Sequence, residues 1–467
     1  MLYQIYPRSF ADSNADGVGD LAGIRARLDY LDWLGVDGLW LNPTFPSPNK
    51  DWGYDVSDYC SVHPELGTME DLDELVADAD KRGIRVLLDL VPAHTSDQHE
   101  WFTKSRSSRD SARREWYIWR DQATEQESVF GGPAWTFDER TDQYYHHLFL
   151  PEQPDLNWMN REVGDAFERI LRFWFDRGIA GFRIDVVHEV VKDPPERANP
   201  PQIHKLLRSW RKLARTYDPE RVFVGETWVM ELDALATFYG DGTDELHLAF
   251  NFPFMFAPLE SAARAEIVGR TYEVLPDDAW PVWALSNHDV VRFPTRLCEE
   301  NDTTVKAALL FLLALQGTPV LYHGDELGMK QVEIPPERVL DVHGRDGART
   351  PIPWGDPDWR DPWLPLGENT RTVADQRDDP SSVLNFCRNL LQLRRGRDDL
   401  TDGRYERLHT PLDVWAWRRG EGTVVAVNLC DREVAIELGG RVLLSTLGRE
   451  DASNLAPWEG VVLALSG

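Results

Sequence analysis

The sequence predicts an α/β fold: a (β/α)8 TIM barrel with an inserted subdomain after strand 3 and a C-terminal antiparallel β domain. Short β-rich runs alternate with amphipathic helical stretches, as they do in βα units around a parallel sheet. The alternation continues to about residue 375, far beyond the roughly 250 residues of a bare barrel, so this span must contain an insertion. The remaining residues show strand-like alternation, which is typical of an antiparallel sheet.

The barrel is assigned to residues 1–94 and 159–375. A first strand is expected near the start of the chain, and the other β-rich runs are residues 36–41, 85–91, 181–187, 221–226, 283–287 and 318–324. Between two of these runs, Leu72, Leu75, Val76 and Ala79 have helical spacing, which predicts a helix over residues 71–82. Gly83 is expected to end this helix, because glycine readily adopts the left-handed conformation of a helix terminus.

Two further segments complete the predicted organisation. Residues 95–158 are rich in Trp, Tyr, Gly and charge and follow the strand that ends near Asp89, so we expect a subdomain over the barrel mouth. Residues 376–467 contain a predicted helix over residues 381–395 and alternating runs such as VWAWR and TVVAVNL. This part is assigned as a linking helix and a C-terminal β domain.

Composition limits the possible partners of the chain. Of 467 residues, 50 are basic and 79 acidic, a formal net charge of -29, which disfavours binding to nucleic acid or an anionic membrane. The four cysteines lie far apart without a CxxC pair, which favours a reduced compartment. The sequence shows neither a signal peptide nor an apolar stretch long enough to span a membrane, so a cytoplasmic protein is expected. A monomer or weak homo-oligomer is expected as well.

Acidic residues stand at the carboxyl ends of four predicted strands: Asp89, Asp185, Glu226 and Asp289. A parallel barrel places its reacting groups at these ends. One such acid alone is more simply explained as a helix cap. Four acids, together with the nearby Arg183 and His288, indicate an active site. No organic cofactor is expected.

The chemistry that these acids suit is cleavage of the acetal between two sugars, which needs a carboxylate and a carboxylic acid. Arg183 and Asp185 share one face of their strand, so the guanidinium is expected to keep Asp185 ionised as the nucleophile. Glu226 follows the apolar run VFVG and precedes Trp228, surroundings that favour its protonated form as the acid. Asp289 is expected to hold the hydroxyls of the distorted sugar ring.

A series of motifs then suggests a family. They are YQIYPRSF (3–10), GVDGLWLNP (35–43), DLVPAH (89–94), QPDLN (153–157), GFRID (181–185), GETW (225–228), NHD (287–289) and GTPVLYHGDELGM (317–329). In this order they resemble the α-amylase superfamily of glycoside hydrolases and transglycosylases, and closely its α-glucosidase and oligo-1,6-glucosidase branch. The resemblance covers nearly the whole chain. It implies a retaining enzyme with Asp185 as nucleophile, Glu226 as acid/base and Asp289 as transition-state stabiliser.

The resemblance also implies which residues bind the terminal glucose. Tyr54 would be the platform and Asp55 the carboxylate for its hydroxyls, with Arg349 paired to Asp55. The other residues that it implies are His94, Arg183 and His288 as further donors, and Phe130, Phe149 and Gln153 as walls from the inserted subdomain. The alternative for His94 and His288 is that each is a core histidine whose hydrogen bonds are satisfied within the fold.

The stretch DSNADGVGD offers oxygen ligands at Asp12, Asn14, Asp16 and Asp20, with the Val18 carbonyl free to join them. Calcium prefers such an oxygen cage, although no Glu closes the loop as in an EF-hand. An Asx-rich turn without an ion is the alternative. The resemblance favours a structural Ca²⁺ or Mg²⁺.

The activity expected from these features is an exo-acting α-glucosidase that releases glucose from short oligosaccharide or disaccharide substrates. VVHE after the nucleophile replaces the Lys-His pair of many endo-acting amylases. Val186, directly after the nucleophile, implies by resemblance a preference for α-1,6 bonds. Two alternatives remain open: a glucosyl transferase or isomerase of the same family, and a catalytically inactive binding subunit.

Overall fold

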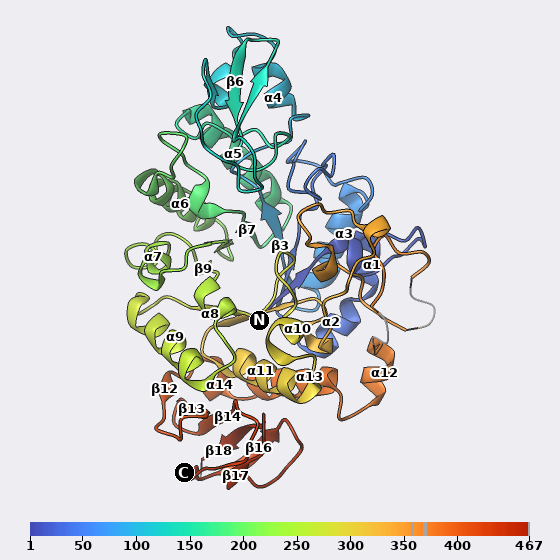
Figure 1. Ribbon diagram of the computed structural model, residues 1–467, viewed down its shortest axis with the longest axis vertical. Helices are drawn as coiled ribbons and strands as arrows, with labels where there is room; N and C mark the ends of the chain where they lie inside the picture. The colour runs from blue at the N-terminus through green and yellow to red at the C-terminus, as the bar shows by residue number, and fades with distance from the viewer. Residues whose placement is uncertain (356–358, 368–370, 466–467) are drawn as a thin grey trace.

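The centre of the molecule is a parallel sheet. The computed structural model describes residues 1–355, 359–367 and 371–465. Eight parallel strands follow the order β10-β11-β1-β2-β3-β7-β8-β9, and a parallel bridge between Phe250 and Val282 joins the two ends (Figure 1). The strands are β1 Leu2–Ile5, β2 Gly38–Leu41, β3 Arg85–Leu90, β7 Gly181–Ile184, β8 Val222–Gly225, β9 Leu248–Ala249, β10 Val282–Ala284 and β11 Thr318–Tyr322. The predicted barrel is confirmed, and β9 is the strand that the sequence did not reveal.

Helices connect the barrel strands. They are α1 Leu21–Ala26, α2 Leu28–Leu34, α3 Met69–Asp80, α5 Arg161–Asp176, α6 Pro200–Ala214, α7 Leu232–Thr237, α8 Phe252–Phe256, α9 Ser261–Val274, α10 Phe293–Cys298 and α11 Asp302–Ala314. Helix α3 begins two residues before the predicted start, because Thr68 and Asp71 form a capping box that satisfies the first free N–H groups. Its Leu72, Leu75 and Ala79 are buried, as their spacing predicts.

The insertion lies between β3 and α5. It contains α4 (Glu100–Ser105) and an antiparallel sheet in the order β4-β6-β5, formed by Trp119–Arg120, Gln143–His146 and Trp135–Asp138 (top of Figure 1). The segment returns to the barrel through a bridge between Asp155 and His94 at the end of β3. The subdomain therefore follows the third barrel strand and lies at the carboxyl end of that strand.

The C-terminal part packs at the opposite end of the molecule (Figure 1). Its helices are α12 Val373–Asp378, α13 Val383–Arg395 and α14 Asp398–Thr401. Its main sheet consists, in spatial order, of β12 Tyr405–Arg407, β13 Val414–Arg419, β14 Thr423–Asn428, β18 Gly460–Ala464 and β16 Arg441–Ser445. A separate pair is formed by β15 Val434–Ala435 and β17 Asn454–Leu455. Arg394 of α13 donates to the carbonyls of Leu313, Leu315 and Gly317 at the end of α11. These bonds satisfy the free carbonyls of a helix end and fix the linking helix to the barrel.

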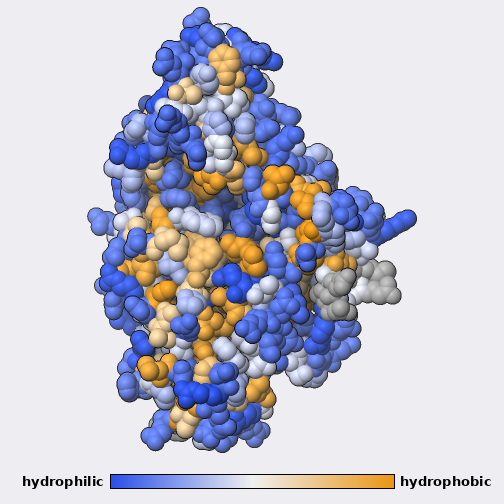
Figure 2. Space-filling model, viewed as in Figure 1, coloured by the Kyte–Doolittle hydropathy of each residue, from blue (hydrophilic) through white to orange (hydrophobic). Residues whose placement is uncertain are grey.

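The surface in Figure 2 is mostly hydrophilic over the inserted subdomain, and hydrophobic side chains show across the middle of the molecule. Within residues 1–355, 359–367 and 371–465, no helix has the length and apolar character needed to cross a lipid bilayer.

Candidate active site

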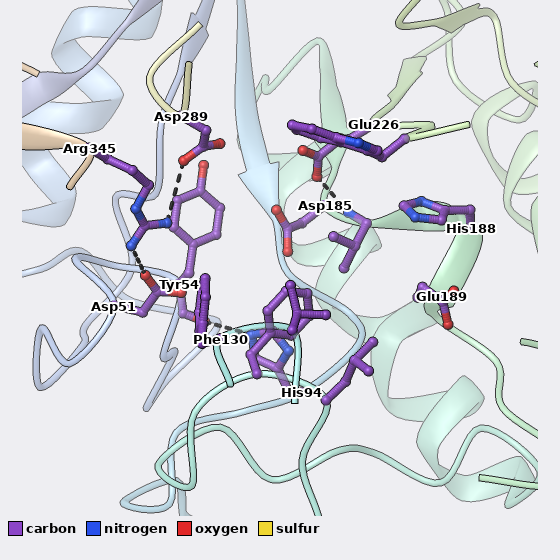
Figure 3. Close-up of a pocket in the computed structure, with 15 residues that line it drawn as sticks. Asp51, Tyr54, His94, Phe130, Asp185, His188, Glu189, Glu226, Asp289 and Arg345 are labelled. Atoms are coloured by element: carbon purple, nitrogen blue, oxygen red, sulfur yellow. Dashed lines mark hydrogen bonds and ion pairs between the residues drawn. The ribbon is translucent and has the colours of Figure 1, made fainter. Parts of the chain in front are cut away.

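A cavity of about 400 Å³ opens where the barrel strands end, between the barrel and the inserted subdomain (Figure 3). Its walls come from loops after several strands and from the subdomain. The lining residues are Asp51, Tyr54, His94, Val129, Phe130, Leu148, Phe149, Asp185, Val186, His188, Glu189, Glu226, Trp228, Asp289 and Arg345. The three acids expected from the sequence to react with substrate therefore lie in one pocket.

Arg183 on β7 connects the reacting acids. Its Nη1 donates to Asp89 Oδ1 at 2.8 Å and to Asp185 Oδ1 at 2.6 Å. Its Nη2 lies 2.8 Å from Glu226 Oε2, and the guanidinium is almost fully buried. One planar cation thus holds the carboxyl groups of Asp185 and Glu226 next to each other, although Arg183 itself does not line the cavity.

Burial dominates the electrostatics of this cluster. It raises the pKa of Asp185 well above its ordinary value and that of Asp89 to about 6, against the opposing effect of Arg183. Arg183 favours the ionised form of Asp185, as expected from the sequence, but burial and then the neighbouring carboxylates oppose this effect.

Asp289 has the opposite balance. Burial favours its neutral form, but His288, Arg349 and Arg345 together lower the pKa of Asp289 below its ordinary value. Arg349 Nη2 lies 2.9 Å from Asp289 Oδ1, and Arg345 Nη1 lies 3.4 Å from the same oxygen. The neighbouring cations thus favour the ionised form of Asp289, whereas burial favours the protonated forms of Asp185 and Asp89.

The backbone of Val186 is strained. Its φ of +36° lies in the left-handed region, which a β-branched residue rarely adopts. In this conformation the Val186 N–H donates to Glu226 Oε2 at 2.8 Å. The strained turn after Asp185 therefore orients the carboxyl group expected to be the acid/base.

The polar end of the pocket differs from the prediction. Asp51 Oδ1 lies 2.5 Å from Arg345 Nη2, and both residues line the cavity. The predicted pair of Asp55 and Arg349 does not form, since Arg349 binds Asp289. Asp55 is fully buried and accepts hydrogen bonds from Ser47 Oγ and from the N–H groups of Lys50 and Asp51. Asp55 thus shapes the loop, and Asp51 is the carboxylate that faces the cavity.

The remaining predicted binding residues form two groups. Tyr54, His94, Phe130 and Phe149 line the cavity. His288 and Gln153 lie behind these walls: His288 Nε2 is 2.6 Å from the Tyr54 hydroxyl, and Gln153 Nε2 donates to Asp51 Oδ2 at 3.0 Å. The His288 ring, from the barrel, and the Gln153 amide, from the inserted subdomain, therefore orient residues that line the cavity.

Sequence reasoning missed several lining residues: Asp51, Val129, Leu148, His188, Glu189 and Arg345. Asp51 and Arg345 lie in DWGYD and GRDGARTP, four residues before the predicted Asp55 and Arg349. The sequence signal that could have pointed to Asp51 is Gly53. Its φ of +106° allows the tight turn between Asp51 and Tyr54. An added Cβ at Gly53 would stand 2.9 Å from the Pro43 Cβ, so this tight turn requires glycine.

Comparison with known proteins agrees with this geometry. Residues 4–403 match the family model described as the alpha amylase catalytic domain. The chain belongs to the α-amylase family. It is 37% identical to the probable alpha-glucosidase of Rhizobium meliloti over 94% of this chain and 90% of that protein. It is 35% identical to the glucan 1,6-alpha-glucosidase of Streptococcus pneumoniae, over 100% and 98%. The trehalulose synthase MutB from Pseudomonas mesoacidophila superimposes with a TM-score of 0.93 at 32% identity, over 100% and 98%.

In this α-amylase family protein, a buried ion pair links the loop after Asp185 to the inserted subdomain. Lys192 Nζ lies 3.1 Å from Asp155 Oδ2, and His146 Nδ1 lies 2.7 Å from the same oxygen. Lys192 and Asp155 are almost fully buried, so each depends on the other for compensation of its charge.

We expect Lys192→Met to lower the free energy of unfolding by about 3–5 kcal/mol, because it leaves the Asp155 carboxylate buried without its cation. Urea unfolding of the purified variant measures this change. Lys205→Met, at an exposed position on α6, is the matched control and should change stability by less than about 0.5 kcal/mol. Equal stability of both variants would contradict a compensating role for Lys192.

The predicted cation loop folds as successive Asx turns. Its side-chain oxygens accept backbone N–H groups as follows: Asp12 from Asn14, Ala15 and Gly17, Asn14 from Asp16, Asp16 from Val18, and Asp20 from Ser13 and Gly23. In the described parts of this α-amylase family protein, no three His, Cys, Asp or Glu side chains form a group able to hold a metal ion. The loop geometry therefore does not test the bound ion, which stays a prediction.

Proposed function

We propose that this protein is an exo-acting retaining α-glucosidase that releases glucose from the nonreducing end of short α-glucosides. The observation that carries the proposal is the pocket itself. Asp185 and Glu226 meet at one guanidinium beside Asp289, and Asp51 with Arg345 provides a polar end for the hydroxyls of one terminal sugar. The α-amylase family membership supports the assignment.

The proposed mechanism is a double displacement. Glu226 protonates the glycosidic oxygen while Asp185 attacks the anomeric carbon, which gives a glucosyl ester and the free leaving group. Water then attacks the ester as Glu226 takes its proton, so the configuration is retained. The two carboxyl groups are expected about 5–5.5 Å apart, as in retaining enzymes. Ionised Asp289 would hold the hydroxyls of the distorted ring.

The test is hydrolysis of p-nitrophenyl α-glucoside, with the first anomer of glucose followed by NMR. Release of α-glucose supports the proposal, and release of β-glucose contradicts retention. A protein that binds the glucoside but does not turn it over would instead be the inactive binding subunit.

A second candidate is glucosyl transfer or isomerisation, favoured by the similarity to trehalulose synthase MutB. Transfer and hydrolysis share the glucosyl ester at the nucleophile and differ only in the acceptor that reaches it. The product profile on sucrose, maltose, isomaltose and trehalose distinguishes them. Predominant free glucose supports hydrolysis, and predominant new disaccharide supports the alternative.

We also infer a preference for α-1,6 linkages from Val186, which lines the pocket next to the nucleophile. Its apolar side chain offers the leaving sugar no hydroxyl and contributes by contact only, so the preference should be about 10-fold. Val186→Thr should shift the ratio of kcat/KM for isomaltose and maltose towards maltose. An unshifted ratio, or a wild type that favours maltose, would show that Val186 does not determine linkage.

We propose further that the loop of Asp12, Asn14, Asp16, Val18 and Asp20 binds Ca²⁺ or Mg²⁺. Asp12 Oδ2, Asn14 Oδ1 and Asp16 Oδ1 each accept one backbone N–H and so keep a lone pair, and hard cations prefer oxygen donors. A chelator should lower Tm by several degrees while turnover below Tm stays unchanged, because the loop does not line the pocket. Asp12→Asn should remove the chelator effect. An unchanged Tm in chelator would refute the site.

The four cysteines are free thiols, which supports a reducing, cytoplasmic location. We propose a monomer or weak homo-oligomer that acts on free sugars, and size-exclusion chromatography with light scattering tests its mass.

A further inference from the structure

Four aromatic rings form a row along one side of the pocket. His94 lies at the end of β3, Phe149 and Phe130 come from the inserted subdomain, and His343 comes from the loop after β11. The ring centroids of His94 and Phe149 are 5.3 Å apart, and those of Phe149 and Phe130 are 5.5 Å apart. Phe130 and His343 stack with centroids 3.7 Å apart and planes inclined by 16°.

The stack of Phe130 on His343 is where two remote parts of the chain meet. Phe130 projects from the subdomain, and His343 stands two residues before Arg345 in a loop fixed by its own acids. Asp346 accepts hydrogen bonds from the N–H groups of Leu340 and Asp341, and Asp341 accepts from Arg345. This loop therefore holds His343 and Arg345 in a defined relation to each other.

The stack also covers the polar end of the pocket. The Arg345 guanidinium lies over the Phe130 ring, 5.5 Å from its centroid, while it pairs with Asp51. Figure 3 shows Phe130 and His94 on one side of the cavity and Asp289 and Glu226 on the other, with Arg345 and Asp51 at the end. If the hydroxyls of the terminal glucose bind to Asp51 and Arg345, as proposed above, a sugar attached to those hydroxyls would have to leave the pocket past this end.

We propose that His343 is a positioning residue that holds Phe130 across the polar end of the pocket and thereby excludes substrates whose terminal glucose carries a substituent. The inference rests on the proposed function and names the feature that makes the enzyme exo-acting. His343 acts through Phe130, since it does not itself line the cavity. Closing the end also keeps water from the Asp51–Arg345 pair, which strengthens its hydrogen bonds to sugar hydroxyls.

The contact of His343 is a ring contact. Its Nε2 is buried without a hydrogen-bond partner among the described residues, so no polar bond of that nitrogen holds the imidazole in place. A phenylalanine at this position should therefore preserve the stack, whereas an alanine should remove it.

The test compares His343→Ala and His343→Phe with wild type on p-nitrophenyl α-glucoside and on ethylidene-blocked p-nitrophenyl maltoheptaoside, whose terminal glucose is substituted. We expect His343→Ala to raise KM for the glucoside about 3- to 10-fold, the effect of one aromatic pair, with kcat within about 2-fold. It should also gain cleavage of the blocked substrate. His343→Phe should behave as wild type in both assays.

Two controls keep the outcome specific. His409→Ala, an exposed histidine of the C-terminal part, should leave both assays unchanged. The effects of Phe130→Ala and His343→Ala should not add in the double variant, because each removes the same stack. If His343→Ala folds poorly, Phe130→Ala alone tests whether the stack excludes the blocked substrate. Unchanged KM, full additivity, or no rescue by phenylalanine would overturn the inference. Wild-type turnover of the glucoside reports on the proposed function separately.

Discussion

Asp185→Asn should lower kcat on p-nitrophenyl α-glucoside by at least about 10,000-fold, the largest effect expected of any single change in this protein. An amide cannot form the glucosyl ester, although it keeps the shape of the side chain beside Arg183 and Glu226. Matched measurements on Asp277→Asn, an exposed aspartate in the loop after α9, should show wild-type kcat. Residual activity above about 1% would reject Asp185 as the nucleophile.

The same substitution should not destabilise the fold at neutral pH. Because the folded-state pKa of Asp185 is raised above its unfolded value, folding is favoured while the group is protonated. This contribution is lost as pH rises from the unfolded pKa through the folded pKa. Asparagine does not ionise, so thermal unfolding should show a Tm equal to or above that of wild type at pH 7. A clear drop in Tm would mean that the ionised form makes stabilising bonds that the amide cannot.

A small anion can identify the face of the sugar on which each carboxylate acts. In Asp185→Gly, azide should enter the space left by the side chain and attack from the nucleophile's face, which gives β-glucosyl azide. In Glu226→Gly, azide should attack the intermediate from the opposite face, which gives α-glucosyl azide. The opposite pair of products would exchange the roles assigned to Asp185 and Glu226.

Much of the fold could be predicted because local pattern and burial agree in it. Strands β3 and β7 are buried on both faces apart from Arg85, as parallel strands are, and an acid stands at or just after the carboxyl end of each. Strand β9 has two residues within ELHLAF, too few for a pattern to emerge. Its position depends on contacts that are distant in sequence, such as the hydrogen bond from the Phe250 N–H to the Gly225 carbonyl.

The reacting acids were predictable for a similar reason. Asp185 and Glu226 directly follow barrel strands, and the geometry of a parallel barrel fixes where such residues point. The raised pKa of Asp185 was not predictable from the pair of Arg183 and Asp185 alone. It comes first from burial of the carboxyl group and then from Asp89 and Glu226, which reach the same guanidinium from other strands.

The polar end of the pocket was assigned to the wrong acid because it is built from two loops far apart in the sequence. DWGYD offers two aspartates and GRDGAR two arginines, each pair four residues apart, and nothing local distinguishes the members. The choice is made by the backbone of the first loop, which turns Asp55 inward to bond the N–H groups of Lys50 and Asp51. Only the packed loops place Asp51 opposite Arg345.

Asp51→Asn should therefore reduce kcat/KM about 100- to 1000-fold, or about 3–4 kcal/mol at 1.4 kcal/mol per factor of ten. It removes a carboxylate that faces the cavity and leaves the largely buried Arg345 without one of its partners. Asp341→Asn is the matched control, because Asp341 pairs with the same guanidinium at 2.8 Å but does not line the cavity. It should lower kcat/KM by no more than about 10-fold.

A double-mutant cycle with Arg345→Met separates binding of the sugar from the pairing of the two charges. If Asp51 and Arg345 act as one unit, the double variant should lose little more kcat/KM than either single variant, since each change already breaks the pair. Additive losses would mean that the two side chains bind the sugar independently. Equal losses in Asp51→Asn and Asp341→Asn would show that the arginine's orientation alone matters, and the assignment of Asp51 as a sugar-binding carboxylate would then fail.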